Sequence, residues 1–313
     1  MARIFGVIGT GKTALESIRY MLTFENLKIP FVIYDPDSEL KKPLEQFCIE
    51  KNIKAYGIKK INSPESLQII RQSKPDVIFS INNFRIIKKD MLSIPRIGII
   101  NYHNGPVPLY RGVNAASWAI INNERTHGVS WHFVDEEIDT GDIVGKKIFY
   151  VANNSTTGRL LFKCVAEGIN LFKKIFPDIY NETLKRIPQQ GESSYYSLKD
   201  LPENNGVIDF NWQAQKISRI VRALNYLPFK NNFVYARLKS ESTPIIVNEI
   251  SIIKEKNTNQ PAGKIIKLDE EHFHVVCSDG IISIDELMNN ENSSLTPIDV
   301  SQILKIKEGD IIY

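Results

Sequence analysis

Residues 3–22, RIFGVIGTGKTALESIRYML, hold the pattern that decides the fold class. Residues 3–8 form an apolar run with the length of one buried strand, and residues 12–24 carry apolar side chains at helical spacing. Gly9 and Gly11 lie between them, where a chain that turns sharply from strand to helix needs glycine. We therefore expect the first strand–turn–helix unit of an α/β sheet.

The same alternation continues through the first half of the chain. Short apolar runs predict strands at residues 31–34, 55–58, 77–81, 97–102 and 129–134, and helical spacing predicts helices at residues 40–51, 64–72, 115–122 and 157–176. Strands that alternate with helices in this way predict a doubly wound, mostly parallel sheet of the Rossmann-like kind.

The last third of the chain has a different pattern. After a predicted helix at residues 213–224, short strands are expected at residues 233–237, 245–252, 263–268, 272–277 and 281–287. We expect an α/β domain over residues 1–190, a polar linker over 191–205, and a helix with a small β-barrel or similar β-rich module over 206–313.

Composition narrows the class of protein. Of the 313 residues, 42% are hydrophobic and 24% charged, which is typical of a globular protein, and the net charge of +3 is too small to indicate nucleic acid by itself. Three scattered cysteines argue against a disulfide scaffold or a zinc site. Because no secretory signal or run of about 18 apolar residues is present, we expect a cytoplasmic protein without a membrane partner.

The glycine turn at residues 6–14, GVIGTGKTA, fits two nucleotide-binding motifs at once. A P-loop is disfavoured because the apolar run continues past its first glycine. The spacing Gly9-x-Gly11-x-x-Ala14, with Asp35 further on, fits a dinucleotide site and would make the protein an NAD-dependent oxidoreductase. We favour a simple tight turn, with at most a phosphate contact at the helix N-terminus, over a dinucleotide site. For the function of the whole protein, a non-catalytic folate- or nucleotide-binding protein is the alternative to an enzyme.

The densest group of reactive residues is IGIINYHNGPVPLYRGVNAASWAIINNERTHGVSWHFVDEEIDTGD, residues 97–142. Asn101 and His103 alternate at the end of a strand and therefore point to the same face, at the sheet edge where open α/β proteins bind ligands. An amide and an imidazole can stabilise an oxyanion, and a carboxylate can orient the imidazole and relay a proton. This set of groups suits an amine that attacks a formyl carbon, with no metal and no covalent nucleophile.

The order N-x-H, a proline-containing loop ending in Y-R-G, H-G-V and D-E-x-I-D-T-G-D resembles the formyltransferase family, which includes enzymes acting on methionyl-tRNA, glycinamide ribonucleotide and amino sugars. The resemblance implies 10-formyltetrahydrofolate as the formyl donor and a catalytic trio at Asn101, His103 and Asp139. Asp142, after the Thr-Gly turn, is the other candidate acid. The role of His132 stays open, because it could face the pocket or solvent.

The resemblance continues at residues 208–212, IDFNW, which are similar to the start of the family's C-terminal open-barrel module. It also implies that four residues hold the pterin of the folate: Phe84, Ile86, Asp135 and Ile138. Contacts to the acceptor are expected from the glycine turn and from the loop after the catalytic histidine: Gly9, Gly11, Lys12, Gly105, Tyr110 and Arg111. That loop reads GPVP at residues 105–108, where the family commonly has SLLP, so the acceptor class is less determined than the reaction.

Charge distribution ranks the acceptors. Residues 201–313 hold 12 Lys and Arg against 15 Asp and Glu, whereas residues 1–200 hold 27 against 21. A module that binds tRNA needs a basic face, so this balance disfavours tRNA. We expect a phosphate-bearing small molecule, an amino-sugar nucleotide first, then methionyl-tRNA, then a carrier-bound aminoacyl group. The family contains monomers and dimers, so a homodimer is compatible with the sequence.

Overall fold

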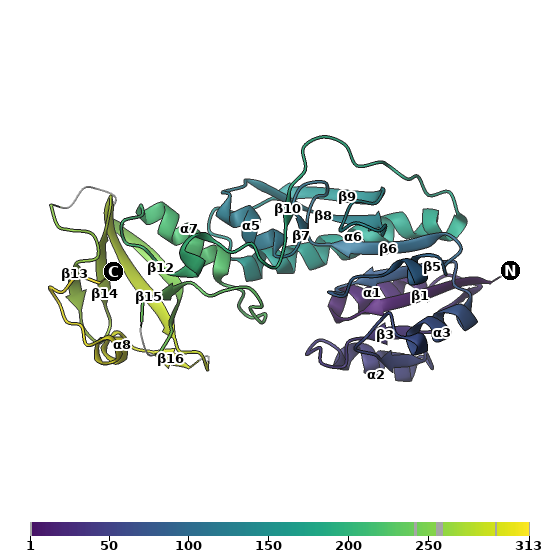
Figure 1. Cartoon of the computed structure of the whole chain (residues 1–313), viewed down its shortest axis with the longest axis horizontal. Helices are drawn as coiled ribbons and strands as arrows, with labels where there is room; N and C mark the ends of the chain where they lie inside the picture. Colours follow the sequence, from purple (N-terminus) through teal and green to yellow (C-terminus); the bar gives the residue numbers. More distant parts are fainter. Residues whose placement is uncertain (1, 241–242, 255–258, 292, 313) are drawn as a thin grey trace. The chain divides into compact units, whose positions relative to one another are not determined.

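The computed structural model describes residues 2–240, 243–254, 259–291 and 293–312 (Figure 1). The chain divides into two compact units. The N-terminal unit is Met1–Ala115, Thr126–Tyr150 and Leu161–Tyr196, and the C-terminal unit is Ala116–Arg125, Val151–Leu160 and Ser197–Tyr313. Each unit therefore combines segments that are separated in the sequence.

The sheet of the N-terminal unit runs in the order β4-β3-β1-β5-β6-β8-β9, and β2 pairs with β1. Its strands are β1 (Arg3–Gly9), β2 (Leu27–Lys28), β3 (Val32–Tyr34), β4 (Ala55–Gly57), β5 (Val77–Ile81), β6 (Gly98–His103), β8 (Thr126–Phe133) and β9 (Ile143–Tyr150). The strands from β1 to β6 pair in parallel, and β8 and β9 are added antiparallel. The predicted doubly wound, mostly parallel sheet is confirmed.

Helices cover both faces of this sheet. Because neighbouring residues of a strand point to opposite faces, each strand contributes apolar side chains to both of these layers. On β5, Phe79 packs with Trp131 against Phe172 of α6, with ring centroids 5.0 to 5.2 Å from that of Phe172. Ile78 points to the other face, into a cluster with Ile70 of α3. The helices of the N-terminal half are α1 (Gly11–Met21), α2 (Lys42–Glu50), α3 (Pro64–Ser73), α4 (Lys89–Leu92), α5 (Ala115–Ile121) and α6 (Thr157–Asn181).

The C-terminal unit contains an antiparallel sheet in the order β11-β12-β15-β14-β13, with β16 paired to β15 (Figure 1). Its elements are η1 (Glu203–Gly206), α7 (Ala214–Leu224), β11 (Arg237–Leu238), β12 (Ile245–Lys254), β13 (Ile265–Leu268), β14 (Phe273–Cys277), β15 (Gly280–Met288), β16 (Ser294–Leu295) and α8 (Pro297–Leu304). On α7, Ile217 and Val221 belong to one buried cluster with Val247 of β12 and Ile284 of β15. The predicted smaller, β-rich C-terminal module is confirmed.

Two short stretches from the N-terminal half belong to the C-terminal unit through contacts with α7 and the residues after it. The hydroxyls of Ser117 and Thr157 donate to the carbonyl oxygen of Ala223 at 2.8 and 2.7 Å. The ring of Trp118 lies 5.7 Å from that of Phe233. The two hydroxyls satisfy a carbonyl at the end of α7, where a helix leaves its last acceptors unpaired.

Within the described ranges, no helix is long and apolar enough to cross a membrane. Cys48, Cys164 and Cys277 are buried and free.

Candidate active site

The carboxyl ends of β1, β5 and β6 meet at one edge of the N-terminal sheet. The register pairs Gly9 with Ile81 and Ile81 with Tyr102. Since neighbouring strands lie about 4.8 Å apart, the glycine turn and the end of β6 are about 10 Å apart along this edge. Two of the predicted groups of site residues therefore share the edge at which open α/β sheets bind ligands.

Asn101 and His103 project from β6 toward Asp139, which lies in the loop between β8 and β9. The His103 Nδ1 atom is 3.4 Å from Asp139 Oδ2, and Asn101 Nδ2 donates to Asp139 Oδ1 at 3.4 Å. The structure thus brings together the amide, the imidazole and the carboxylate named from the sequence.

Asp139 is held in place by hydrogen bonds to both its carboxylate and its backbone carbonyl. The Gly112 N–H donates to Oδ2 at 2.9 Å, and Gln189 Nε2 donates to the Asp139 carbonyl at 2.9 Å. Burial would raise the pKa of this carboxyl, but His103, His132 and the Gly112 N–H outweigh burial and lower the pKa below its usual value. Asp139 is therefore an anion under ordinary conditions.

His103 lies buried behind the carboxylate, with 7% of its surface exposed. Its Nε2 atom is 2.7 Å from the carbonyl oxygen of Tyr110. Because a carbonyl only accepts, Nε2 carries a hydrogen. Burial lowers the pKa of His103, and the neighbouring His132 lowers it further, although Asp139 acts in the opposite direction. The net result favours a neutral imidazole, as a general base requires.

The loop after β6 is fixed closely against His103. Tyr110 has a φ of 60°, its ring stacks on Tyr196 at 5.8 Å, and its N–H donates to Ser194 Oγ at 2.7 Å. A Cβ at Gly105 would press on His103 Nε2, so this position needs glycine for close approach. The short strand β7 (Arg111–Gly112) completes the loop by pairing with β10 (Tyr195–Tyr196).

Packing explains the glycine turn of the first βα unit. Gly9 has a φ of 148°, and a Cβ there would overlap the carbonyl oxygen of Ile81 on the adjacent strand. The side chain of Asn82 donates to the Thr10 carbonyl at 3.0 Å and closes the turn. Asp35, the expected ribose-binding acid of a dinucleotide site, is paired with Arg85 at 3.0 Å.

The predicted anion contacts have different environments. The Lys12 side chain is exposed at the start of α1. Arg111 has a buried Nε atom for which the described part of the chain offers no hydrogen-bond partner.

Large apolar side chains are exposed at the positions predicted to hold the pterin. Phe84 is 87% exposed and Ile86 68%, in the loop after β5, and Ile138 is 41% exposed beside Asp139. Asp135 accepts from the Thr140 hydroxyl at 2.6 Å, in the same acidic loop. Exposed apolar side chains mark a surface that binds a ligand or partner where they form a contiguous patch, whereas single ones are common on any protein.

His132 belongs to the site, and the sequence left its role open. The antiparallel register of β6 and β8 sets it directly opposite Asn101. Its Nε2 atom lies 3.2 Å from Asp139 Oδ1 and 3.3 Å from Asn101 Nδ2. Only the pairing of these two strands could have revealed this contact. Asp142, the other candidate acid, accepts a hydrogen bond from the Phe133 N–H through its backbone carbonyl.

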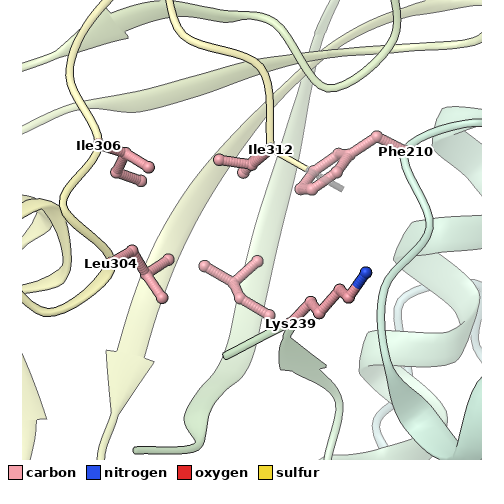
Figure 2. A pocket seen from close by; sticks show the side chains of 6 residues that line it. Phe210, Lys239, Leu304, Ile306 and Ile312 are labelled. Carbon is pink, nitrogen blue, oxygen red and sulfur yellow. The ribbon is translucent and has the colours of Figure 1, made fainter. Parts of the chain in front are cut away.

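Other features offer less for catalysis. A pocket of about 120 Å³ lies in the C-terminal unit (Figure 2), lined by Phe210, Leu238, Lys239, Leu304, Ile306 and Ile312. Its lining is apolar apart from the Lys239 amine. Among the residues that the structure describes, no group of three or more His, Cys, Asp and Glu could hold a metal ion.

The arrangement of Asn101, His103 and Asp139 can support attack by an amine on a carbonyl carbon. A neutral imidazole can take the proton of the amine, the carboxylate can stabilise the imidazolium that forms, and the amide N–H can donate to a developing oxyanion.

Known proteins are similar to this chain over nearly its whole length. The family model "Formyl transferase" matches residues 29–174, and the model "Formyl transferase, C-terminal domain" matches residues 200–304. The methionyl-tRNA formyltransferase of Ruminiclostridium cellulolyticum is 30% identical over 311 residues, which cover 97% of each chain. That of Clostridium beijerinckii is 32% identical over 298 residues, or 92% of this chain and 93% of the relative.

Solved structures have the same fold. An N-formyltransferase from Helicobacter canadensis, in complex with folinic acid and dTDP-3-aminofucose, is 26% identical with a TM-score of 0.68, covering 91% of this chain and 99% of that one. The sugar 3N-formyltransferase WlaRD, at 24% identity and a TM-score of 0.67, covers 94% of this chain and 99% of its own. With both family models matched and relatives of at least 30% identity over nearly the full length, this chain belongs to the formyltransferase family.

Proposed function

We propose that the chain transfers a formyl group from 10-formyltetrahydrofolate to a primary amine, with Asn101, His103 and Asp139 as the catalytic residues. The observation that carries this proposal is the Asp139 carboxylate held against His103 Nδ1 and Asn101 Nδ2. The amine nitrogen bonds to the formyl carbon, and Asn101 donates to the resulting oxyanion. The proton of the amine passes through His103 to the folate nitrogen as its bond to the formyl carbon breaks.

For the folate, we propose the exposed surface formed by Phe84, Ile86, Asp135 and Ile138. The Helicobacter canadensis structure contains folinic acid, a folate derivative, and supports a folate co-substrate here. Apolar side chains suit the aromatic face of a pterin, and the acidic loop offers acceptors for its ring N–H groups.

For the acceptor, we propose methionyl-tRNA as the first candidate. Relatives with that name match 97% of this chain, including its C-terminal unit. This reverses the order favoured by the charge distribution alone, which placed an amino-sugar nucleotide first.

An amino-sugar nucleotide is the second candidate. The Helicobacter canadensis structure contains dTDP-3-aminofucose, and the acidic balance of residues 201–313 favours an acceptor other than a polyanion. Gly9, Gly11, Lys12, Gly105, Tyr110 and Arg111 are proposed for the acceptor side. Lys12 and Arg111 are the cations that could meet its phosphates.

Release of tetrahydrofolate tests the reaction and the acceptor together. The protein would receive 10-formyltetrahydrofolate with methionyl-tRNA, amino-sugar nucleotides or aminoacyl carriers in parallel, and the His103→Ala variant would be the control. We expect release that depends on methionyl-tRNA and is lost in the variant. Release with a sugar nucleotide alone would assign the second candidate. Absence of folate binding together with absence of release would overturn the proposal.

A further inference from the structure

We propose that residues 187–196, a segment that comes after α6 in the chain, position both loops of the active site, and that Gln189 and Ser194 are the positioning residues through which this segment acts. The inference rests on the proposed catalytic roles of His103 and Asp139 and not on the identity of the acceptor.

Pairing with the main sheet sets the register of this segment. The N–H groups of Ile187 and of Ile143 on β9 each donate to the carbonyl oxygen of the other, at 3.0 and 2.8 Å. Two residues further on, Gln189 is half-buried, whereas Pro188 and Gln190 on either side of it are exposed. The segment therefore brings Gln189 to the loop between β8 and β9, which carries the catalytic carboxylate.

Gln189 holds the turn that presents Asp139. Its Nε2 atom donates to the carbonyl oxygen of Asp139 at 2.9 Å and to that of Gly141 at 2.8 Å. Asp139 has a φ of 55°, in the left-handed region that costs free energy for a residue other than glycine. Such a backbone persists only where its surroundings hold it. The two hydrogen bonds of Gln189 supply that support and keep the Asp139 carboxylate against His103.

Ser194 holds the other loop, which follows β6. Its Oγ accepts from the Tyr110 N–H at 2.7 Å, and its own N–H donates to the Pro108 carbonyl at 3.2 Å. Tyr110 also has a left-handed backbone, with a φ of 60°. Its carbonyl oxygen lies 2.7 Å from Nε2 of His103 and decides which ring nitrogen carries the hydrogen. Ser194 therefore places the carbonyl that orients His103.

One segment thus supports both partners of the imidazole. Nδ1 of His103 faces Asp139, and Nε2 faces Tyr110, so a shift of either loop would turn the ring or separate it from the acid. A misplacement of about 1 Å in a catalytic group can lower the rate about 10²-fold. The segment should therefore affect turnover through His103 and Asp139.

Hydrogen exchange of two backbone amides, followed by NMR of the 15N-labelled protein, tests the support directly and needs no acceptor. The Gly112 N–H donates to Asp139 Oδ2, and the Tyr110 N–H donates to Ser194 Oγ. We expect Gln189→Met, which keeps the length but loses both donors, to speed exchange at Gly112. Ser194→Ala should speed exchange at Tyr110. Each change should be about fivefold, the factor for one hydrogen bond of ordinary strength.

The matched controls are exposed neighbours in the same segment. Gln190→Met and Ser193→Ala should leave both amides unchanged. Unchanged exchange in Gln189→Met and Ser194→Ala as well would overturn the inference even if formyl transfer is confirmed. Faster exchange in a protein that transfers no formyl group would contradict the proposed function but support the contacts assigned to this segment.

Single-turnover kinetics with 10-formyltetrahydrofolate and methionyl-tRNA test the positioning role of Gln189. We expect Gln189→Met to lower the rate about 10²-fold. In an Asp139→Asn background the same substitution should have little further effect, because it acts through that carboxylate. An equal loss in both backgrounds would show that Gln189 only stabilises the fold and would overturn its positioning role.

Ser194 is tested by a conservative rescue. Ser194→Ala should lower the rate, and Ser194→Thr, which keeps the hydroxyl, should restore it. Equal losses in the two variants would contradict a role for the Oγ atom. Should Gln189→Met not fold, this pair still decides whether the segment positions the site, and the exchange rates decide it if methionyl-tRNA is not the acceptor.

Discussion

Asp139 connects the groups of the active site, because His103, Asn101 and the Gly112 N–H all contact its carboxylate. We expect Asp139→Asn to keep the shape of the site and to lower kcat by about 10² to 10⁴, the usual contribution of a proton-transfer group. Single-turnover formyl transfer measures this loss. Asp142→Asn is the matched control from the same loop and should retain its rate. If Asp142→Asn lost activity and Asp139→Asn did not, the catalytic acid would be Asp142.

The pH dependence follows from the state of His103. Burial lowers its pKa below the ordinary value of 6.5, and a base must be unprotonated to act. Activity should therefore be constant near pH 7 and fall as the pH drops below 6.5, through the folded pKa. A kcat/KM profile between pH 5 and 8 measures the position of this limb, and a limb that lies above pH 6.5 would contradict the prediction.

At the scale of single residues, the sequence predicts part of the candidate active site. The alternation on one strand predicts that Asn101 and His103 share a face, and the resemblance to formyltransferases adds Asp139. The sequence does not predict the contact of His132, since that depends on which strand pairs with β6. The Gly112 N–H is likewise invisible, because a backbone donor has no residue signature.

The turn between β1 and α1 has a requirement for glycine that can be measured. In Gly9→Ala the added methyl group would overlap the Ile81 carbonyl, and the backbone has a φ of 148°. We expect the free energy of unfolding to fall by about 2 to 4 kcal/mol, from backbone strain and overpacking together. Gly191→Ala is the control, since Gly191 has a φ of 91° but nothing within 4 Å of its Cβ position. Equal losses in urea unfolding would show that overlap is unimportant.

The end of α7 gives a second prediction at the scale of elements. Ser117→Ala and Thr157→Val each remove one of the two hydroxyls on the Ala223 carbonyl. Each should destabilise by about 1 kcal/mol, and the double variant should cost more than the sum, because the carbonyl is then buried without these partners. Thr183→Val, which removes an exposed hydroxyl, serves as control. Simple additivity in the double-variant cycle would contradict this account.

Most elements of the sheet could be predicted from periodicity, and the exceptions have physical reasons. β9 escapes prediction because Lys146 and Lys147 interrupt its apolar pattern, yet both side chains are exposed on an edge strand where polar residues face water. β2, β7 and β10 are each two residues long: β2 pairs with β1 in the main sheet, and β7 and β10 form a small sheet of their own by pairing with each other. Patterns within one segment carry no information about such partners.

At the scale of the whole molecule, the salt dependence of the KM for the acceptor tests whether the acceptor is a polyanion. If the acceptor is methionyl-tRNA, its KM should rise with salt, with a logarithmic slope of about 0.7 to 0.9 for each phosphate that the protein neutralises. The KM for 10-formyltetrahydrofolate should change much less. Both are measured between 50 and 200 mM potassium chloride, about the range over which such binding weakens. A salt-independent KM for the tRNA would contradict a polyanionic acceptor.

The fold class and the β-rich C-terminal module could be predicted for the whole chain, because binary patterns and glycine turns are local signals. The boundaries expected at residues 190 and 206 remain a prediction. The assignment of residues 116–125 and 151–160 to the C-terminal unit depends on contacts such as those of Ser117 with Ala223, more than 100 residues away in sequence.

This interleaving has an evolutionary consequence. Modular proteins exchange domains by recombination when one cut in the gene separates two complete units. In this protein no single cut separates the two units. The stretches whose hydroxyls donate to the carbonyl at the end of α7 are encoded within the N-terminal half. A C-terminal unit inherited alone would leave those partners behind. We therefore expect the two halves of this gene to have diversified together, with new acceptors reached by substitution and loop variation and not by exchange of the C-terminal module.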